Sequence, residues 1–157
     1  MKRTAHSKNT QTDIRFVKDW PAQEIIGLYK AGGWWDDSDH SSVKKMISGS
    51  FVFAVAVDTE TGKAVGMGRA LSDGTYDAYI QDVVVLPEHR GKDIGKKIIL
   101  AIRDICLKKK LSWIGLVAEP GTEKFYSGLG FRPMKGHTPM RFMMDLVFSK
   151  KKNAGGL

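Results

Sequence analysis

The sequence has a single cysteine and no long apolar run, and both shortages exclude classes of protein. Of its 157 residues only Cys106 is a cysteine, which excludes a disulfide framework and a multi-thiolate metal site within one chain. No apolar run approaches the roughly 18 residues that a membrane span needs. Residues 1–13 lack the apolar stretch of a signal peptide. We therefore expect an intracellular, cytoplasmic protein with no membrane partner.

Excess charge is also scarce in the body of the chain. The formal net charge is +8, but residues 1–12 and 149–157 each carry three basic residues and no acidic one, which leaves +2 for residues 13–148. A nucleic-acid-binding domain carries its basic excess on the folded surface, whereas basic tails are usually solubilising ends. The charge distribution therefore argues against a nucleic-acid partner, and a basic nucleic-acid binder is kept only as a third hypothesis.

The remaining composition, 42% hydrophobic and 27% charged without internal repeats, is that of a globular domain. We expect one domain over residues 13–148 with flexible basic tails at 1–12 and 149–157. The hydrophobic periodicity predicts helices at about 21–31, 43–47, 93–108 and 123–129. It predicts strands at 14–18, 51–57, 64–71, 78–86 and 112–118, and a terminal strand pair within 131–148. This order indicates a mixed α/β fold with a central meander.

The most informative stretch is VVVLPEHRGKDIGK, residues 83–96. A strand ends, the chain turns through a loop rich in glycine and lysine, and a long helix begins at about Asp93. A helix start presents unpaired N–H groups that suit a phosphate, and Arg90, Lys92 and Lys96 add positive charge around it. The stretch is neither a Walker A sequence nor a dinucleotide fingerprint. Spacing alone leaves a phosphate site and a plain strand–helix turn equally open.

The stretch resembles motif A of the GCN5-related N-acetyltransferases, the GNAT family, Arg/Gln-x-x-Gly-x-Gly/Ala. Arg90 and Gly95 match its first and last positions, and Asp93 stands where the family usually has its middle glycine. Residues 124–131, KFYSGLGF, are similar to motif B, Phe-Tyr-x-x-x-Gly-Phe. The motifs occur in the family's order, so the resemblance covers about residues 14–148. It implies a mixed, mostly antiparallel sheet that is splayed between its fourth and fifth strands and flanked by helices.

The resemblance implies an enzyme that moves the acetyl group of acetyl-CoA, its cosubstrate, to a primary amine by direct attack in a ternary complex. By position, the N–H of Val83 would polarise the thioester carbonyl, and Val85 would pair with the pantetheine amides. Glu119 stands where many relatives have an asparagine that binds pantetheine. The cofactor-binding residues implied in this way are Val83, Val84, Val85, Arg90, Gly91, Lys92, Asp93, Ile94, Gly95, Lys96 and Glu119. Asp93 is expected to face away from the phosphates as a helix cap.

Two side chains are predicted to take part in the chemistry. The resemblance implies that Tyr126 protonates the departing CoA thiolate, and a phenol with a pKa of about 10 is protonated at neutral pH. Asp82 is the candidate base, because an ammonium must lose a proton before it attacks. Relatives with a glutamate base carry it where this sequence has Tyr79, which is no base. Strand alternation puts Asp82 on the face of Ile80 and Val84, unless a bulge re-aims it. The alternatives to Asp82 are Asp77, Glu119 and a water chain.

The acceptor site is expected to include Trp34, Trp35 and Tyr79. The tryptophans open a loop that also carries Asp36, Asp37 and Asp39, and aromatic faces with carboxylates suit an amine cation. One of the two tryptophans is expected to anchor the loop to the core. The loop and the strand IQDVVV look like a bacterial group of GNAT proteins related to arylalkylamine acetyltransferases. This likeness favours a small amine over an amino sugar, a polyamine or a protein lysine.

A second hypothesis is a CoA-binding regulatory or interaction module with the GNAT fold and little activity. It is supported by Asp93, Glu119 and the missing strand glutamate. Cys106 falls on the apolar side of the long helix and is expected in the core. The four histidines have no metal-ligand spacing, so no metal is predicted. A homodimer is common in the family, and no residue here demonstrates one.

Overall fold

The computed structural model describes residues 11–35 and 40–142, which fall into two units, residues 1–118 and 119–157. Each unit is described by itself. In the first unit the elements follow one another as β1 (Thr12–Phe16), α1 (Ala22–Ala31), α2 (Ser41–Gly49), β2 (Val52–Asp58), β3 (Ala64–Leu71), β4 (Asp77–Val85), the 3-10 helix η1 (Pro87–His89), α3 (Ile94–Lys108) and β5 (Trp113–Gly115). The predicted mixed α/β order is confirmed in this unit.

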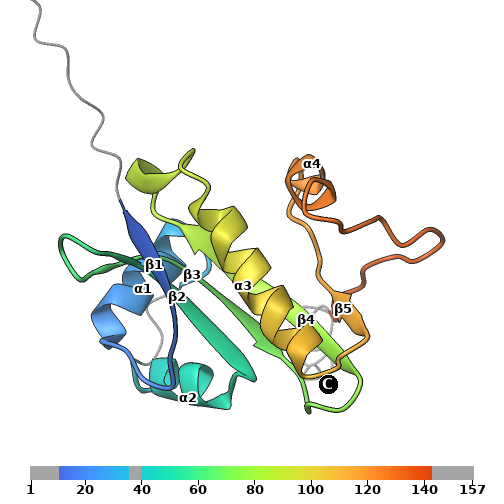
Figure 1. Ribbon diagram of the computed structural model, residues 1–157, viewed down its shortest axis with the longest axis horizontal. Coiled ribbons are helices and arrows are strands. Elements are labelled where there is room, and N and C mark those ends of the chain that lie inside the picture. Colours follow the sequence, from blue (N-terminus) through green and yellow to red (C-terminus); the bar gives the residue numbers. More distant parts are fainter. Residues whose placement is uncertain (1–10, 36–39, 143–157) are drawn as a thin grey trace, which may run out of the picture. The chain divides into compact units, whose positions relative to one another are not determined.

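Within the described residues, the centre of the first unit is a five-stranded sheet in the order β1-β2-β3-β4-β5 (Figure 1). The first four strands are antiparallel, and β5 runs parallel to β4. Tight turns join β2 to β3 and β3 to β4, where Gly62 and Gly74 take φ values of 69° and 82° that glycine adopts without strain. A parallel pair needs a crossover, and α3 supplies it.

Helices cover both faces of this sheet. Isoleucines of α3 lie over the face that carries Gly66 and Gly68, which we call the α3 face (Figure 1). A Cβ atom on Gly68 would lie 2.8 Å from Ile98 Cγ2, so only glycine permits this close approach. The opposite face, here the α1 face, packs against α1 and α2. Its core cluster includes Ile25, Leu28, Val43, Ile47, Phe53, Met67 and Val84. Cys106 is fully buried, as predicted.

The pairing between β4 and β5 is short. Only Asp77–Tyr79 of β4 pairs with β5, although β4 continues to Val85. The predicted strand at 112–118 is therefore three residues long, and the sheet opens between its fourth and fifth strands as expected. Beyond Tyr79, β4 has no strand partner on that side among the described residues, so its backbone edge is available for other bonds.

The second unit contains α4 (Glu123–Ser127), which is shorter than the predicted helix. The predicted terminal strand pair is wrong for residues 131–142, which form no strand, and residues 143–148 lie outside the described residues. Pro133 and Pro139 cannot donate to a strand ladder. Between them, Gly136 has a φ of 76° in a turn where the His137 N–H bonds to the Met134 carbonyl at 3.2 Å.

None of the helices within residues 11–35 and 40–142 has both the length and the apolar character needed to cross a membrane.

Candidate functional site

Strand β4 contains a bulge at Asp82. Met67 and Arg69 of β3 pair with Val84 and Gln81, so two steps along β3 face three steps along β4. Asp82 has a φ of 56°, in the left-handed region that few residues other than glycine adopt. Aspartate is one of those that tolerate it. A bulge takes the extra residue out of the ladder and re-aims the side chains that follow.

The bulge decides which side chains share a face. Asp82 bonds to a side chain of α1, and Val84 belongs to the α1-face cluster, so the predicted common face of these two is confirmed. Ile80 pairs with Ala70, which lies two residues after Gly68 on the α3 face. The predicted grouping of Ile80 with Asp82 is therefore wrong, because the extra residue shifts the alternation between them.

The Asp82 carboxylate is held by two side chains that the sequence analysis did not single out. Its Oδ2 accepts hydrogen bonds from Tyr29 Oη at 2.7 Å and from Arg69 Nε at 2.6 Å. The side chains of Arg69 and Asp82 are only 15% and 21% exposed. Burial, together with the charge of Asp82, raises the pKa of Tyr29 well above its usual range, so the phenol stays a donor. An arginine within the apolar strand AVGMGRAL was the available signal.

The end of β4 leads directly into the loop before α3. Val83 and Val85 point to the α3 face, where their methyl carbons would lie 3.2 Å and 3.3 Å from Cβ atoms built on Gly68 and Gly66. Both side chains are half-buried. Arg90 folds back so that its Nε donates to the Val85 carbonyl at 2.9 Å. The loop is thereby tied to the strand end whose backbone is predicted to bind the cofactor.

The start of α3 has an open backbone. Gly91 has a φ of 74°, and a Cβ there would meet no atom within 4 Å. The Lys97 N–H bonds to the Asp93 carbonyl at 3.0 Å. The amides of residues 94–96 therefore precede the helical ladder, and such amides lack helical partners. Ile94 is buried, Lys92 and Gly95 are half-buried, and Lys96 is exposed.

Asp93 takes the place of the usual family glycine with a φ of 58°. The left-handed conformation explains why glycine suits this position and why aspartate can replace it. The carboxylate is exposed, but it makes no cap hydrogen bond to the helix, so the expected capping role is wrong. A left-handed N-cap residue differs from the usual β-region geometry in which the side chain reaches the N2 or N3 amide.

The predicted acceptor residues lie close to the bulge. Trp34 is 41% exposed, whereas Trp35 is half-buried against the α1-face cluster, which confirms that one tryptophan anchors the loop. Both rings contact Tyr29, with centroid distances of 6.4 Å and 6.0 Å. Tyr79 is exposed on β4, at the last residue paired with β5. The predicted loop carboxylates Asp36, Asp37 and Asp39 lie outside the described residues.

The remaining predicted residues, Glu119 and Tyr126, belong to the second unit. The Glu119 carbonyl accepts bonds from the N–H and Oγ1 of Thr122, at 3.0 Å and 2.7 Å, in the turn before α4. The Tyr126 ring lies edge-on to Phe125 and Phe131, with centroid distances of 5.0 Å and 6.0 Å. Burial, and secondarily the Glu119 charge, raises the pKa of Tyr126, which keeps the phenol protonated.

No group of three or more histidine, cysteine, aspartate or glutamate side chains that could hold a metal ion occurs in the described part of the chain.

Comparisons with known proteins place this geometry in a family. Residues 49–133 match the family model of the acetyltransferase (GNAT) domain. The chain is 38% identical over 69 residues to GCN5-related N-acetyltransferase 2, chloroplastic, of Arabidopsis thaliana, which is 44% of this chain and 27% of that protein. It is 36% identical over 72 residues to histone acetyltransferase TAP1 of Glycine max, 46% of this chain and 31% of that protein.

Serotonin N-acetyltransferase 2, chloroplastic, of Oryza sativa subsp. japonica is 34% identical over 76 residues, 48% of this chain and 38% of that protein. The chain thus spans well under two thirds of these relatives. The solved aminoglycoside N-acetyltransferase AAC(6')-Iy in complex with CoA has the same fold, with a TM-score of 0.67, 18% identity and coverage of 88% of this chain and 99% of that chain. The family model covers more than half of the chain, and the chain therefore belongs to the GNAT acetyltransferase family.

Proposed function

We propose that the protein is an acetyl-CoA-dependent N-acetyltransferase that acts on a primary amine in a ternary complex. The observation that carries this proposal is the bulge at Asp82, which lies on the strand that runs into the open start of α3. The family match spans parts of both units, so we propose one GNAT domain over residues 13–148. The cytoplasmic location stays a prediction, since two of the relatives are named chloroplastic.

The loop before α3 and its first turn are proposed to hold the CoA pyrophosphate. The amides of residues 94–96 lack helical partners, and the open space at Gly91 lets a ligand approach the backbone. The edge of β4 near Val85, which has no strand partner among the described residues, would pair with the pantetheine amides beside the Arg90 Nε that already donates to the Val85 carbonyl. The Val83 N–H would donate to the thioester oxygen as negative charge develops there, a contribution of about 3 kcal/mol in comparable sites.

The chemistry is proposed to be direct attack of a neutral amine on the thioester carbonyl. The C–N bond forms first and the carbonyl electron pair moves to oxygen; the C=O bond then re-forms as the C–S bond breaks, and the CoA thiolate leaves with its electron pair. Tyr126 then protonates the thiolate, which its raised pKa supports because the phenol carries its proton at neutral pH. Asp82 takes the proton that the substrate ammonium must lose to become the neutral, attacking amine. Its Oδ2 already accepts two hydrogen bonds, so Oδ1 is the proposed proton acceptor.

The acceptor is proposed to be a small amine. An exposed Trp34 beside Tyr29 offers an aromatic face to a cation. One relative is named for serotonin and another for histone, so a small arylalkylamine and a protein lysine are the two acceptors to compare first. Arylalkylamines, polyamines, amino sugars and lysine peptides form the panel for a thiol-release assay.

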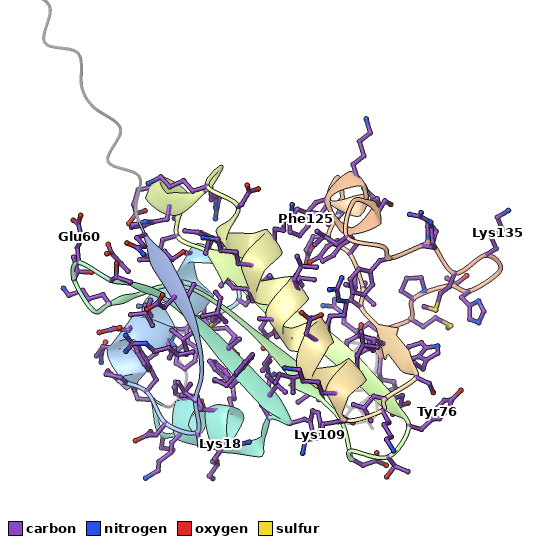
Figure 2. The ribbon with its side chains drawn as sticks, in the orientation of Figure 1. Lys18, Glu60, Tyr76, Lys109, Phe125 and Lys135 are labelled. Atoms are coloured by element: carbon purple, nitrogen blue, oxygen red, sulfur yellow. The ribbon has the colours of Figure 1, made fainter. Side chains whose placement is uncertain are left out.

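We expect the protein to release CoA thiol from acetyl-CoA when at least one small amine is present. Without an amine, we expect it to bind the cosubstrate and release no thiol. Tyr126→Phe should lower kcat about 100-fold, because the thiolate loses its proton donor. Tyr76→Phe is the matched control, since Tyr76 is 63% exposed and points outward from the turn between β3 and β4 (Figure 2). CoA binding without thiol release from any amine would instead support a regulatory module with the GNAT fold.

A further inference from the structure

We propose that Tyr29 and Arg69 are positioning residues that act through Asp82, holding the bulge of β4 in the conformation that aims the Val83 N–H. Tyr29 also joins this bulge to the loop that carries Trp34 and Trp35. The inference rests on the proposed function, because it assigns a purpose to the Val83 amide. Its evidence is a strained backbone, a pair of short hydrogen bonds, a half-buried ion pair and a shared aromatic contact.

The strained backbone comes first. Asp82 has a φ of 56°, which costs an L-residue a steric penalty. Such a conformation persists only where contacts with the surrounding structure hold it. The peptide group that follows Asp82 carries the N–H of Val83. The direction of this N–H therefore depends on the backbone angles at Asp82, and any slip of the bulge would turn it away from a ligand.

The two hydrogen bonds fix Asp82 from two different elements. Tyr29 Oη approaches from α1 at 2.7 Å and Arg69 Nε from β3 at 2.6 Å, and both donate to the same oxygen. A carboxylate held by donors from a helix and from a neighbouring strand can neither rotate nor shift along the sheet without losing one of them. The side chain thus locks the backbone conformation that the left-handed φ alone would not favour.

The ion pair adds a reason to expect specificity more than stability. The side chains of Arg69 and Asp82 are 15% and 21% exposed, so both charges are largely removed from water. A pair of this kind returns little net stability, because desolvation offsets the attraction between the charges. Its best-attested use is to select one arrangement over competing ones. Here the competing arrangement is a β3–β4 ladder without the extra residue.

Tyr29 also reaches the acceptor loop. Its ring contacts Trp34 and Trp35 at centroid distances of 6.4 Å and 6.0 Å, and its carbonyl accepts the Trp34 N–H at 3.0 Å. One residue therefore contacts the loop that is proposed to bind the amine and the carboxylate at the bulge. An acceptor bound against Trp34 would therefore be one contact away from Tyr29, the residue that donates a hydrogen bond to Asp82.

Two mild variants test the proposal. Tyr29→Phe removes only the hydroxyl, and Arg69→Met removes the charge and every N–H donor while keeping an unbranched side chain. Their matched controls are Tyr76→Phe and Arg103→Met, which change an exposed tyrosine and an arginine whose ion pair among the described residues is with its neighbour Asp104. Arg69→Lys is the conservative variant, which keeps the positive charge but not the donor geometry of the guanidinium.

The first readout is kinetic. Tyr29→Phe and Arg69→Met should each lower kcat about 10-fold or more and leave the KM for acetyl-CoA nearly unchanged. The reason is that the Val83 amide, once misdirected, no longer stabilises the developing oxyanion, whereas binding of the ground state does not depend on it. Arg69→Lys should recover part of the loss. Normal kcat values in both variants, or losses matched by their controls, would overturn the proposal.

The second readout does not require turnover. The amide signal of Val83 in ¹⁵N-labelled protein, saturated with CoA, should move in Tyr29→Phe and Arg69→Met and stay in place in both controls. If the wild-type protein acetylates no amine but this signal still responds, the proposed function fails and the positioning role stands. An unmoved Val83 signal in folded variants would overturn the positioning role, whatever the activity of the wild-type protein.

Discussion

Two aspartates in this chain adopt nearly the same rare backbone conformation for different reasons. Asp82 in β4 and Asp93 before α3 have φ values of 56° and 58°. Asp82 is half-buried, and its carboxylate accepts hydrogen bonds from Tyr29 and Arg69. Asp93 is exposed and makes no cap bond. The first is held in place by its side chain, whereas at the second only the backbone conformation is required.

The largest expected effect follows from replacing Asp82 by glycine. Glycine adopts the positive φ freely but offers nothing to Tyr29 or Arg69. We expect the Asp82→Gly variant to fold and to lose about 100-fold in kcat, a loss typical of a misplaced oxyanion donor or a missing base. Thiol-release kinetics measures the loss, and CoA titration verifies that the cofactor still binds. Full activity in Asp82→Gly would erase the distinction between the two aspartates.

Asp82→Asn sharpens the same comparison. Asparagine also tolerates the left-handed region and can accept the Tyr29 hydrogen bond, but it cannot take a proton from an amine. If Asp82 is the base, Asn should be as inactive as Gly. Activity in Asp82→Asn well above that of Asp82→Gly would assign the proton to another acceptor and leave Asp82 as the anchor of the bulge.

The next effect is a pH dependence of stability that comes from Tyr29, the hydrogen-bond partner of Asp82; Asp93 has no such partner on its cap side. The pKa of Tyr29 is raised mainly by burial, so at high pH the unfolded chain loses this proton while the folded protein keeps it. Stability from Tyr29 is therefore fully present below the unfolded phenol pKa of about 10 and falls by roughly 1.4 kcal/mol per pH unit above it. Denaturant unfolding from pH 9 to 11 should show the wild-type advantage over Tyr29→Phe shrinking. A constant difference over this range would contradict the buried, bonded phenol.

The smallest effects are expected at Asp93. Asp93→Gly removes a negative charge from the proposed pyrophosphate site and should tighten CoA binding by about 3-fold, in line with the modest energies of exposed charges. Its unfolding free energy should change by less than about 1 kcal/mol, because relief of strain and the added entropy of glycine oppose each other.

Asp93→Ala separates charge from conformation at this position. It removes the same charge, so calorimetry should show a similar gain in CoA affinity. It keeps a side chain at positive φ without the local hydrogen bonding of aspartate, and it should unfold about 1 kcal/mol more easily than Asp93→Gly. Weaker CoA binding in both variants would mean that the carboxylate contributes to the site.

The contrast between Asp82 and Asp93 also marks how far sequence reasoning reaches. The helix before Gly32, the strand Ala64–Leu71 and the helix from Ile94 were predicted closely, because their apolar periodicity is a local property. The two motifs located the candidate site because each is a short stretch of neighbouring residues and is therefore also a local property of the sequence. Conformation at Asp93 follows from its place in a motif that usually has glycine there.

The bulge could not be predicted in the same way. Its position depends on which residues of β3 pair with β4, and alternation along β4 alone gave the wrong face for Ile80. Tyr29 and Arg69 are distant in sequence from Asp82, so their hydrogen bonds were invisible before the fold was known. The predicted terminal strand pair was wrong over residues 131–142, where Pro133 and Pro139 cannot donate hydrogen bonds to a strand ladder.

The close approach of α3 to Gly68 has a consequence for ligand affinity. A helix of 15 residues is about 22 Å long and bends little. Any side chain placed at Gly68 would collide with Ile98 and push the first turns of α3 away from the sheet. The amides that open α3 would move with them, so a methyl group buried in the sheet, touching no ligand, should weaken the proposed binding of CoA.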